Sequence, residues 1–174
     1  MMLITDGCLL LCLGLIAFQD FKQRQISWYL IPLSFFLVVY KAVNLIDTTV
    51  FIKHSIFNIV FVLIQLILLT TYISIKNKAL TNIVNTYLGI GDILFFIVVC
   101  IAFSPVNFIV FFIVSMILTL IGFMLYSTFL KKAGTEIPLA GTMATALIIL
   151  LITKKIMIPI NFYNDDYFLS MITK

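Results

Sequence analysis

The chain has 174 residues, of which 63% are hydrophobic and 10% are charged, and its formal net charge is +4. A soluble domain carries about 25% charged residues and has too little interior to hide so many apolar side chains. The composition therefore excludes an ordinary soluble domain and indicates a membrane protein. The basic residues form no patch, so nucleic acid is not expected as a partner.

Six apolar segments follow one another along the chain, and each predicts a transmembrane helix. They cover residues 2–18, 28–46, 50–75, 93–103, 106–130 and 138–152. Most approach the roughly 20 residues that span a bilayer, whereas the fourth is short unless it starts within 88–92. No repeat or long linker interrupts them, so we expect one all-α domain over residues 1–174. Residues 154–174 form a tail that we expect at the membrane interface.

The first segment is apolar apart from Thr5 and Asp6 and has neither a basic leader region nor a small-residue cleavage site. These features favour a retained helix over a cleaved signal peptide. The three cysteines all stand in apolar stretches and form no C-x-x-C pair, so we expect buried thiols, not a zinc site or disulfides. They are Cys8, Cys12 and Cys100.

The positive charges between the segments indicate the orientation of the chain. With the N-terminus outside, the loops 19–27, 76–91 and 131–137 lie on the cytoplasmic side. These loops hold Lys22, Arg24, Lys76, Lys78, Lys131 and Lys132. The positive-inside rule favours this orientation, although Lys154, Lys155 and Lys174 then fall outside. We expect a multi-pass protein of the inner (plasma) membrane.

Two of the seven acidic residues lie in patterns that a structural role does not require. Asp20 stands at the cytoplasmic end of the first segment, and Asp92 opens the fourth segment at the same end. The orientation therefore predicts that both carboxylates lie at the same membrane depth. The other five acids are expected to cap helices or to lie on a solvated surface. They are Asp6, Asp47, Glu136, Asp165 and Asp166.

Each of these two carboxylates also has a purely structural interpretation. Asp92 follows Gly89–Gly91, where glycines permit the close backbone approach and unusual dihedrals that binding an extended peptide needs. The same pattern fits a helix N-cap after a glycine turn. Asp20 precedes Lys22 and Arg24, a pattern that also fits an interfacial turn. Spacing alone leaves both interpretations open.

Three short motifs, taken together, are typical of one protein family. They read Asp20-x-Lys22-x-Arg24-x-Ile26, Gly89-x-Gly91-Asp92 and Glu136-Ile137-Pro138-Leu139-Ala140-Gly141. This set resembles the prepilin peptidases (type IV leader peptidases) among the G-x-G-D intramembrane aspartyl proteases, in a short form without the methylation domain. The family's first motif usually continues Ile-Pro-Asn, where this chain has Ile26-Ser27-Trp28. The family usually carries Lys where this chain has Leu94.

The resemblance implies an aspartyl endopeptidase with Asp20 and Asp92 as its catalytic pair and with Gly89 and Gly91 at the bound substrate. Two carboxylates close together cannot both ionise cheaply, so the pair shares one proton. The ionised member activates a water and the protonated member polarises the scissile carbonyl, with neither role assigned to either residue. No metal or cofactor is implied.

The implied substrate is a prepilin-like protein with a short basic leader, a glycine before the cut and an apolar helix. Lys22 and Arg24 would repel such a leader, so we expect them to contact lipid headgroups of the bilayer. His54, the single histidine, has no partner motif and is expected at the interface. The oligomeric state does not follow from the sequence.

Two other functional classes stay open. A proton-coupled transporter would need polar residues at the bilayer midplane, where Gln65 is the main exception to apolar helix centres. A catalytically silent relative that acts as a membrane scaffold fits Leu94 at the position where the family has Lys.

Overall fold

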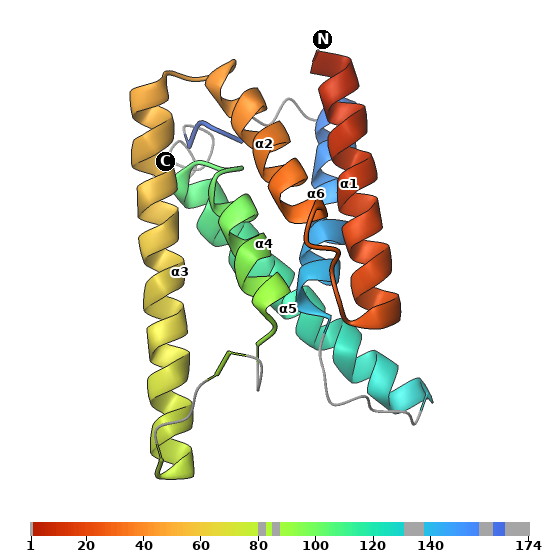
Figure 1. The fold of residues 1–174 in the computed structure, drawn as a ribbon, viewed down its shortest axis with the longest axis vertical. Helices are drawn as coiled ribbons and strands as arrows, with labels where there is room; N and C mark the ends of the chain where they lie inside the picture. Colours follow the sequence, from red (N-terminus) through yellow and green to blue (C-terminus); the bar gives the residue numbers. More distant parts are fainter. Residues whose placement is uncertain (1, 80–82, 85–87, 131–137, 157–161, 166–174) are drawn as a thin grey trace, which may run out of the picture.

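The computed structural model describes residues 2–79, 83–84, 88–130, 138–156 and 162–165, and these form six α-helices (Figure 1). Their bounds are α1 Met2–Gln23, α2 Leu30–Val43, α3 Thr48–Asn77, α4 Ile90–Cys100, α5 Pro105–Leu130 and α6 Leu139–Ile156. Each helix corresponds to one apolar segment, so the all-helical class is confirmed. Consecutive helices run in opposite directions, which brings the end of α1 and the starts of α4 and α6 to the same side of the molecule.

Three helices are long and apolar enough to cross a membrane, namely Ile4–Gln23 of α1, Thr48–Asn77, and Pro105–Leu125 of α5. These helices support a membrane protein. The other three are apolar but shorter. The 11 residues of α4 rise only about 17 Å, less than the hydrocarbon thickness of about 30 Å. Six full-length spans are therefore not seen.

Several helix ends differ from the predicted boundaries, and two of these differences bear on the acidic residues. α1 continues to Gln23, so Asp20 lies in its last turn and not after the helix. Apolar composition marks where a chain leaves lipid, whereas Gln and Lys are good helix formers and prolong the helix. α4 begins at Ile90 with Gly89 as an extended N-cap (φ −68°, ψ 145°), so Asp92 lies in its first turn.

Helices α1 and α6 lie side by side (Figure 1), and small residues let their backbones approach closely. Ala140, Gly141 and Ala144 are buried on α6. A Cβ added to Gly141 would lie 3.4 Å from the carbonyl oxygen of Ala17 on α1. Small residues at helix contacts serve the same purpose in membrane bundles generally. This contact fixes the position of the end of α1 against the start of α6.

A buried asparagine joins α3 to the end of α4. Asn58 is 0% exposed, and its Nδ2 donates hydrogen bonds to the carbonyl oxygens of Cys100 (2.8 Å) and Phe103 (2.9 Å). Carbonyl groups at a helix C-terminus lack intrahelical partners, so the amide satisfies groups that would otherwise be unpaired in the interior. Asn58 thereby holds the short helix α4 in place.

We expect Asn58→Ala to lower the free energy of unfolding by about 2–4 kcal/mol, because two buried carbonyls lose their donors. Thermal unfolding in detergent measures this loss. Asn44→Ala is the matched control, since Asn44 is exposed and bonds only to Tyr40 of its own helix. That control is expected to change stability by about 0.5 kcal/mol or less. Equal losses in the two variants would show that the Asn58 contacts add nothing.

Part of the C-terminal tail packs against the start of α5. Phe162 is buried, and its carbonyl oxygen accepts a hydrogen bond from the Ser104 N–H (2.8 Å). Asp165 Oδ1 accepts hydrogen bonds from the Ser104 hydroxyl (2.5 Å) and the Asn107 N–H (3.3 Å), so this carboxylate caps α5. Residues 154–156 continue α6. The described parts of the tail therefore belong to the folded bundle, and the rest lies outside the described residues.

The other acidic residues have varied surroundings. Asp6 forms an ion pair with Lys41 that joins α1 to α2. Asp47 occupies the N-cap position of α3, but its side chain makes no capping hydrogen bond. Glu136 and Asp166 lie outside the described residues.

Among the cysteines, Cys12 and Cys100 are buried and Cys8 is exposed. The prediction of a buried thiol is therefore wrong for Cys8, because the outer face of a membrane helix is itself apolar. His54 is half-buried near the start of α3.

Candidate active site

Two consecutive backbone amides at the start of α6 each donate a hydrogen bond to one of the two candidate carboxylates. The Ala140 N–H donates to Asp92 Oδ1 (2.8 Å) and the Gly141 N–H donates to Asp20 Oδ2 (2.5 Å). The first N–H groups of a helix have no intrahelical partner, and the helix dipole favours negative charge beside them. The start of α6 therefore brings together Asp20 from the end of α1 and Asp92 from the start of α4.

The separation of the two carboxylates follows from these bonds. Consecutive amide nitrogens in an α-helix lie about 3 Å apart. The accepting oxygens of Asp20 and Asp92 are therefore within about 8 Å of each other. The two carboxylates therefore lie close together at the start of α6.

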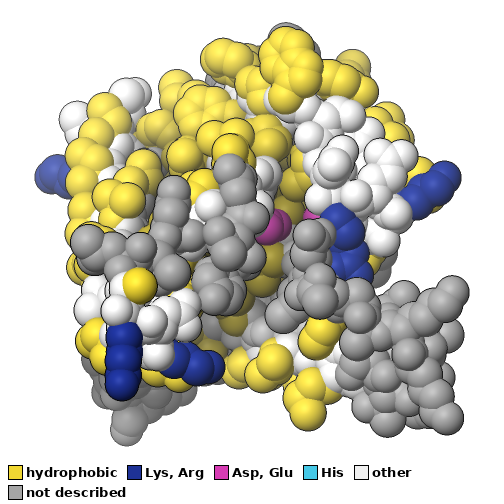
Figure 2. Space-filling model, turned by 60° about the horizontal axis from the view of Figure 1, so that its bottom comes forward, with side chains coloured by type: hydrophobic (Ala, Val, Ile, Leu, Met, Phe, Trp, Pro, Cys, Tyr) yellow, Lys and Arg dark blue, Asp and Glu magenta, His cyan; other side chains and the backbone are white. Residues whose placement is uncertain are grey.

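Burial distinguishes the two side chains. Asp20 is only 6% exposed, whereas Asp92 is half-buried. Burying a carboxylate is costly unless it is hydrogen-bonded, and α6 supplies that bond in each case. On the face that carries this end of the bundle, acidic side chains are recessed near the middle, with basic side chains beside them and toward the rim (Figure 2).

Gly89 and Gly91, predicted to contact substrate, provide space around the candidate site. Within the described parts of the chain no glycine has a positive φ, so the expectation of unusual dihedrals is wrong. A Cβ on Gly89 would lie 3.1 Å from Asp92 Oδ2, and one on Gly91 would lie 3.3 Å from Ile26 Cδ1. The glycines therefore make room for a carboxylate and for the side chain of Ile26.

Gly141 has a role that the sequence motif did not specify. A Cβ added there would lie 2.8 Å from Asp20 Oδ2 and 3.1 Å from Asp20 Cβ. Real Cβ atoms essentially never approach other atoms below 3.0 Å, so a side chain at this position would displace the carboxylate. In the sequence, only the presence of a glycine in the motif that contains Pro138 pointed to this position. The packing of α1 on α6 shows that Gly141 allows the close approach of Asp20.

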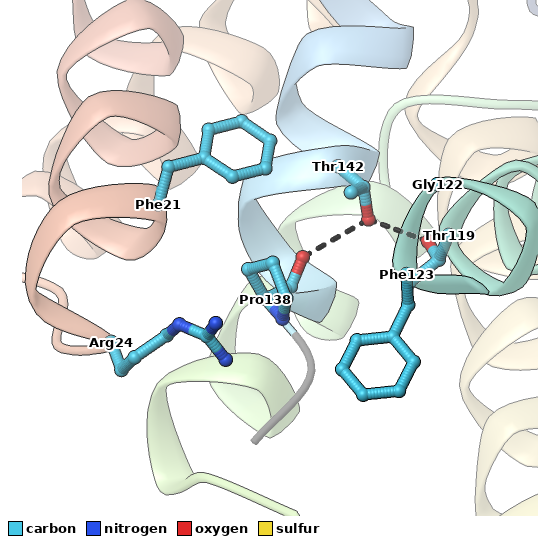
Figure 3. A pocket seen from close by; sticks show the side chains of 7 residues that line it. All are labelled: Phe21, Arg24, Thr119, Gly122, Phe123, Pro138 and Thr142. Atoms are coloured by element: carbon cyan, nitrogen blue, oxygen red, sulfur yellow. Dashed lines mark hydrogen bonds between the residues drawn. The ribbon is translucent and has the colours of Figure 1, made fainter. Parts of the chain in front are cut away.

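A cavity of about 380 Å³ lies where the end of α1 and the start of α6 meet α5, and Phe21, the neighbour of Asp20 in sequence, lines it. Its lining residues come from the end of α1, from α5 and from the start of α6 (Figure 3). They are Phe21, Arg24, Thr119, Gly122, Phe123, Pro138 and Thr142. Gly89 and Gly91 are not among them.

The positions at which the motifs depart from the family lie away from this cavity. Trp28 is 81% exposed and Leu94 is 42% exposed. The Ser27 N–H donates a hydrogen bond to Gln19 Oε1 (2.8 Å), which closes the turn after α1.

Two carboxylates at one helix N-terminus can share a proton and hold a water for attack on a carbonyl. No three His, Cys, Asp or Glu side chains gather into a metal-binding group in the part of the chain that the structure describes. Comparison with protein-family models, curated proteins and solved structures found no match.

Proposed function

We propose that the protein is a membrane-embedded aspartyl endopeptidase of the prepilin peptidase type, with Asp20 and Asp92 as its catalytic pair. The observation that supports this most strongly is the hydrogen bonding of both carboxylates to consecutive amides of α6. The three motifs that carry the family resemblance supply the two carboxylates and the two amides. One carboxylate is enough to cap a helix N-terminus. An aspartyl mechanism needs two carboxylates, and two bind the start of α6 here.

The proposed mechanism uses the pair with one proton between its members. The ionised carboxylate takes a proton from a water as the water oxygen attacks the scissile carbonyl carbon. The protonated carboxylate gives its proton to the carbonyl oxygen, which forms a tetrahedral intermediate. The C–N bond then breaks, and the amine leaves with the proton that the first carboxylate had taken. One hydroxyl of the intermediate returns its proton to the second carboxylate, which leaves a carboxylic acid product and restores the pair with one proton. The two residues share the titration, so neither role is assigned to Asp20 or to Asp92.

The proposed substrate is a prepilin-like protein whose short basic leader is removed at the cytoplasmic face of the plasma membrane. The basic residues at this end favour that orientation, including Lys22 and Lys76 in the last turns of α1 and α3 and Lys78 directly after α3. The burial of Asp20 and the partial burial of Asp92 suit a peptide bond that enters at the membrane boundary.

Replacing each carboxylate by its amide tests the proposal. We expect Asp20→Asn and Asp92→Asn each to reduce leader removal from a co-expressed prepilin-like protein by about 10³-fold, because the pair can no longer share a proton. Gel mobility and the mass of the product measure the cleavage. Asp47→Asn is the matched control, since this exposed carboxylate makes no capping hydrogen bond. Unchanged processing in both variants would refute the peptidase.

The hydrogen bonds from α6 also support a second candidate, a catalytically silent scaffold in which Asp20 and Asp92 only cap the helix. Leader removal that is absent from the wild-type protein as well as from the variants would favour this candidate. The transporter has less support, because Gln65 is exposed on α3 and lines no interior path.

A further inference from the structure

A cationic group, the guanidinium of Arg24, lines the cavity between α1, α5 and α6. Arg24 directly follows α1 in a left-handed conformation (φ 55°), and its guanidinium points into the cavity (Figure 3). One of its nitrogens, Nη1, is buried and has no hydrogen-bond partner among the residues that the structure describes. A buried guanidinium nitrogen without an acceptor is costly, so the cavity is suited to an anionic group.

The other polar groups of the cavity are already engaged. The Thr119 hydroxyl donates to the Ser115 carbonyl oxygen (2.8 Å) and lies 2.5 Å from the Thr142 hydroxyl. Thr142 in turn bonds to the carbonyl oxygen of Pro138 (3.1 Å). The remaining walls are apolar, with the Phe21 ring on one side and the Phe123 ring on the other (Figure 3). A fitting ligand thus has one anionic group and an apolar body.

The position of the cavity indicates where such a ligand comes from. Arg24 comes directly after the candidate membrane span Ile4–Gln23, at the level where phosphate groups of lipids lie. Exposed apolar side chains of α1 and α5 lie near the cavity residues in sequence, a surface suited to acyl chains. They are Phe18, Phe21, Leu118, Ile121 and Leu125. The membrane itself therefore offers the matching molecule at high local concentration.

We propose that this cavity binds one phospholipid, with its phosphate on Arg24 and an acyl chain between Phe21 and Phe123. Guanidinium groups form strong charge-assisted hydrogen bonds to phosphate. Lys22 does not serve this purpose, because its Nζ lies over the Phe18 ring, 5.3 Å from the centroid. The bound lipid occupies the space between α1, α5 and α6. This proposal does not depend on the peptidase activity.

Titration of the detergent-purified protein tests the proposal, with native mass spectrometry to count bound lipids. The probes are phosphatidylglycerol, diacylglycerol with the same chains, and inorganic phosphate. We expect one phosphatidylglycerol to bind the wild type about tenfold more tightly than diacylglycerol. Arg24→Gln should remove this preference, whereas Lys22→Gln should keep it. Millimolar inorganic phosphate should not displace the lipid, because it lacks the apolar body.

A second variant closes the cavity without removing a charge. Gly122 lines the cavity and a Cβ there would meet nothing within 4 Å, so the side chain of Gly122→Leu should occupy cavity space and reduce lipid binding about tenfold. Gly14→Leu is its matched control, since Gly14 has equally open space on α1 outside the cavity. Equal lipid binding by Arg24→Gln and wild type, or by Gly122→Leu and Gly14→Leu, would overturn the proposal. Displacement by inorganic phosphate would overturn it in favour of a free-anion site.

Discussion

Gly141→Ala is expected to reduce leader cleavage by about 10–100-fold, because it moves Asp20, one of the two proposed catalytic carboxylates. The added Cβ would lie 2.8 Å from Asp20 Oδ2, so either the side chain leaves the Gly141 N–H or α1 separates from α6. The new Cβ would also lie 3.4 Å from the backbone oxygen of Ala17, and this contact limits how α1 and α6 can rearrange. The crowding should also lower the free energy of unfolding by about 1–3 kcal/mol. Cleavage rates and thermal unfolding measure the two effects.

Gly14→Ala and Gly122→Ala are the matched controls, because a Cβ at either position meets nothing within 4 Å. Each is expected to retain cleavage and to stabilise its helix by about 0.5–1 kcal/mol. A loss of stability at Gly141 together with a gain at the two controls would show that close packing, and not ordinary helix propensity, causes the effect at Gly141. Wild-type cleavage in Gly141→Ala would show that the approach of Asp20 to α6 is not needed for the reaction.

Asp20→Ala and Asp20→Asn are expected to lose cleavage equally but to differ in stability. The alanine variant leaves the buried Gly141 N–H without an acceptor, which should lower the free energy of unfolding by about 1–3 kcal/mol. The asparagine variant keeps a carbonyl oxygen for that hydrogen bond and should lose about 1 kcal/mol or less. At Asp92 the same pair of variants should differ by less, because that side chain is only half-buried.

Unfolding curves and leader-removal assays on the same four variants distinguish catalysis from capping. A catalytic role predicts that the asparagine variants are folded and inactive. If the role is purely structural, any cleavage activity of the wild type should fall only as far as stability falls. The asparagine variants, which stay stable, should then keep that activity. Full activity in Asp20→Asn would therefore contradict the catalytic assignment of Asp20 directly.

The number and order of the helices could be predicted from hydropathy alone, for a physical reason. In lipid every backbone polar group needs an internal partner, so a long apolar run forms a helix. The boundaries were less predictable, because hydropathy does not show where hydrogen bonding stops. α1 therefore continues past the polar residues around Asp20, and α4 is too short to span a bilayer.

The sequence by itself determined an all-helical, membrane-type protein, and its motifs singled out Asp20 and Asp92. Tertiary structure alone decided that both carboxylates bind consecutive amides of α6, because the contact between Asp20 and Gly141 joins distant parts of the chain. It also placed Arg24 in the wall of a cavity between α1, α5 and α6. Local patterns determine local conformation, whereas the position of a side chain in space depends on which helices pack together and how closely.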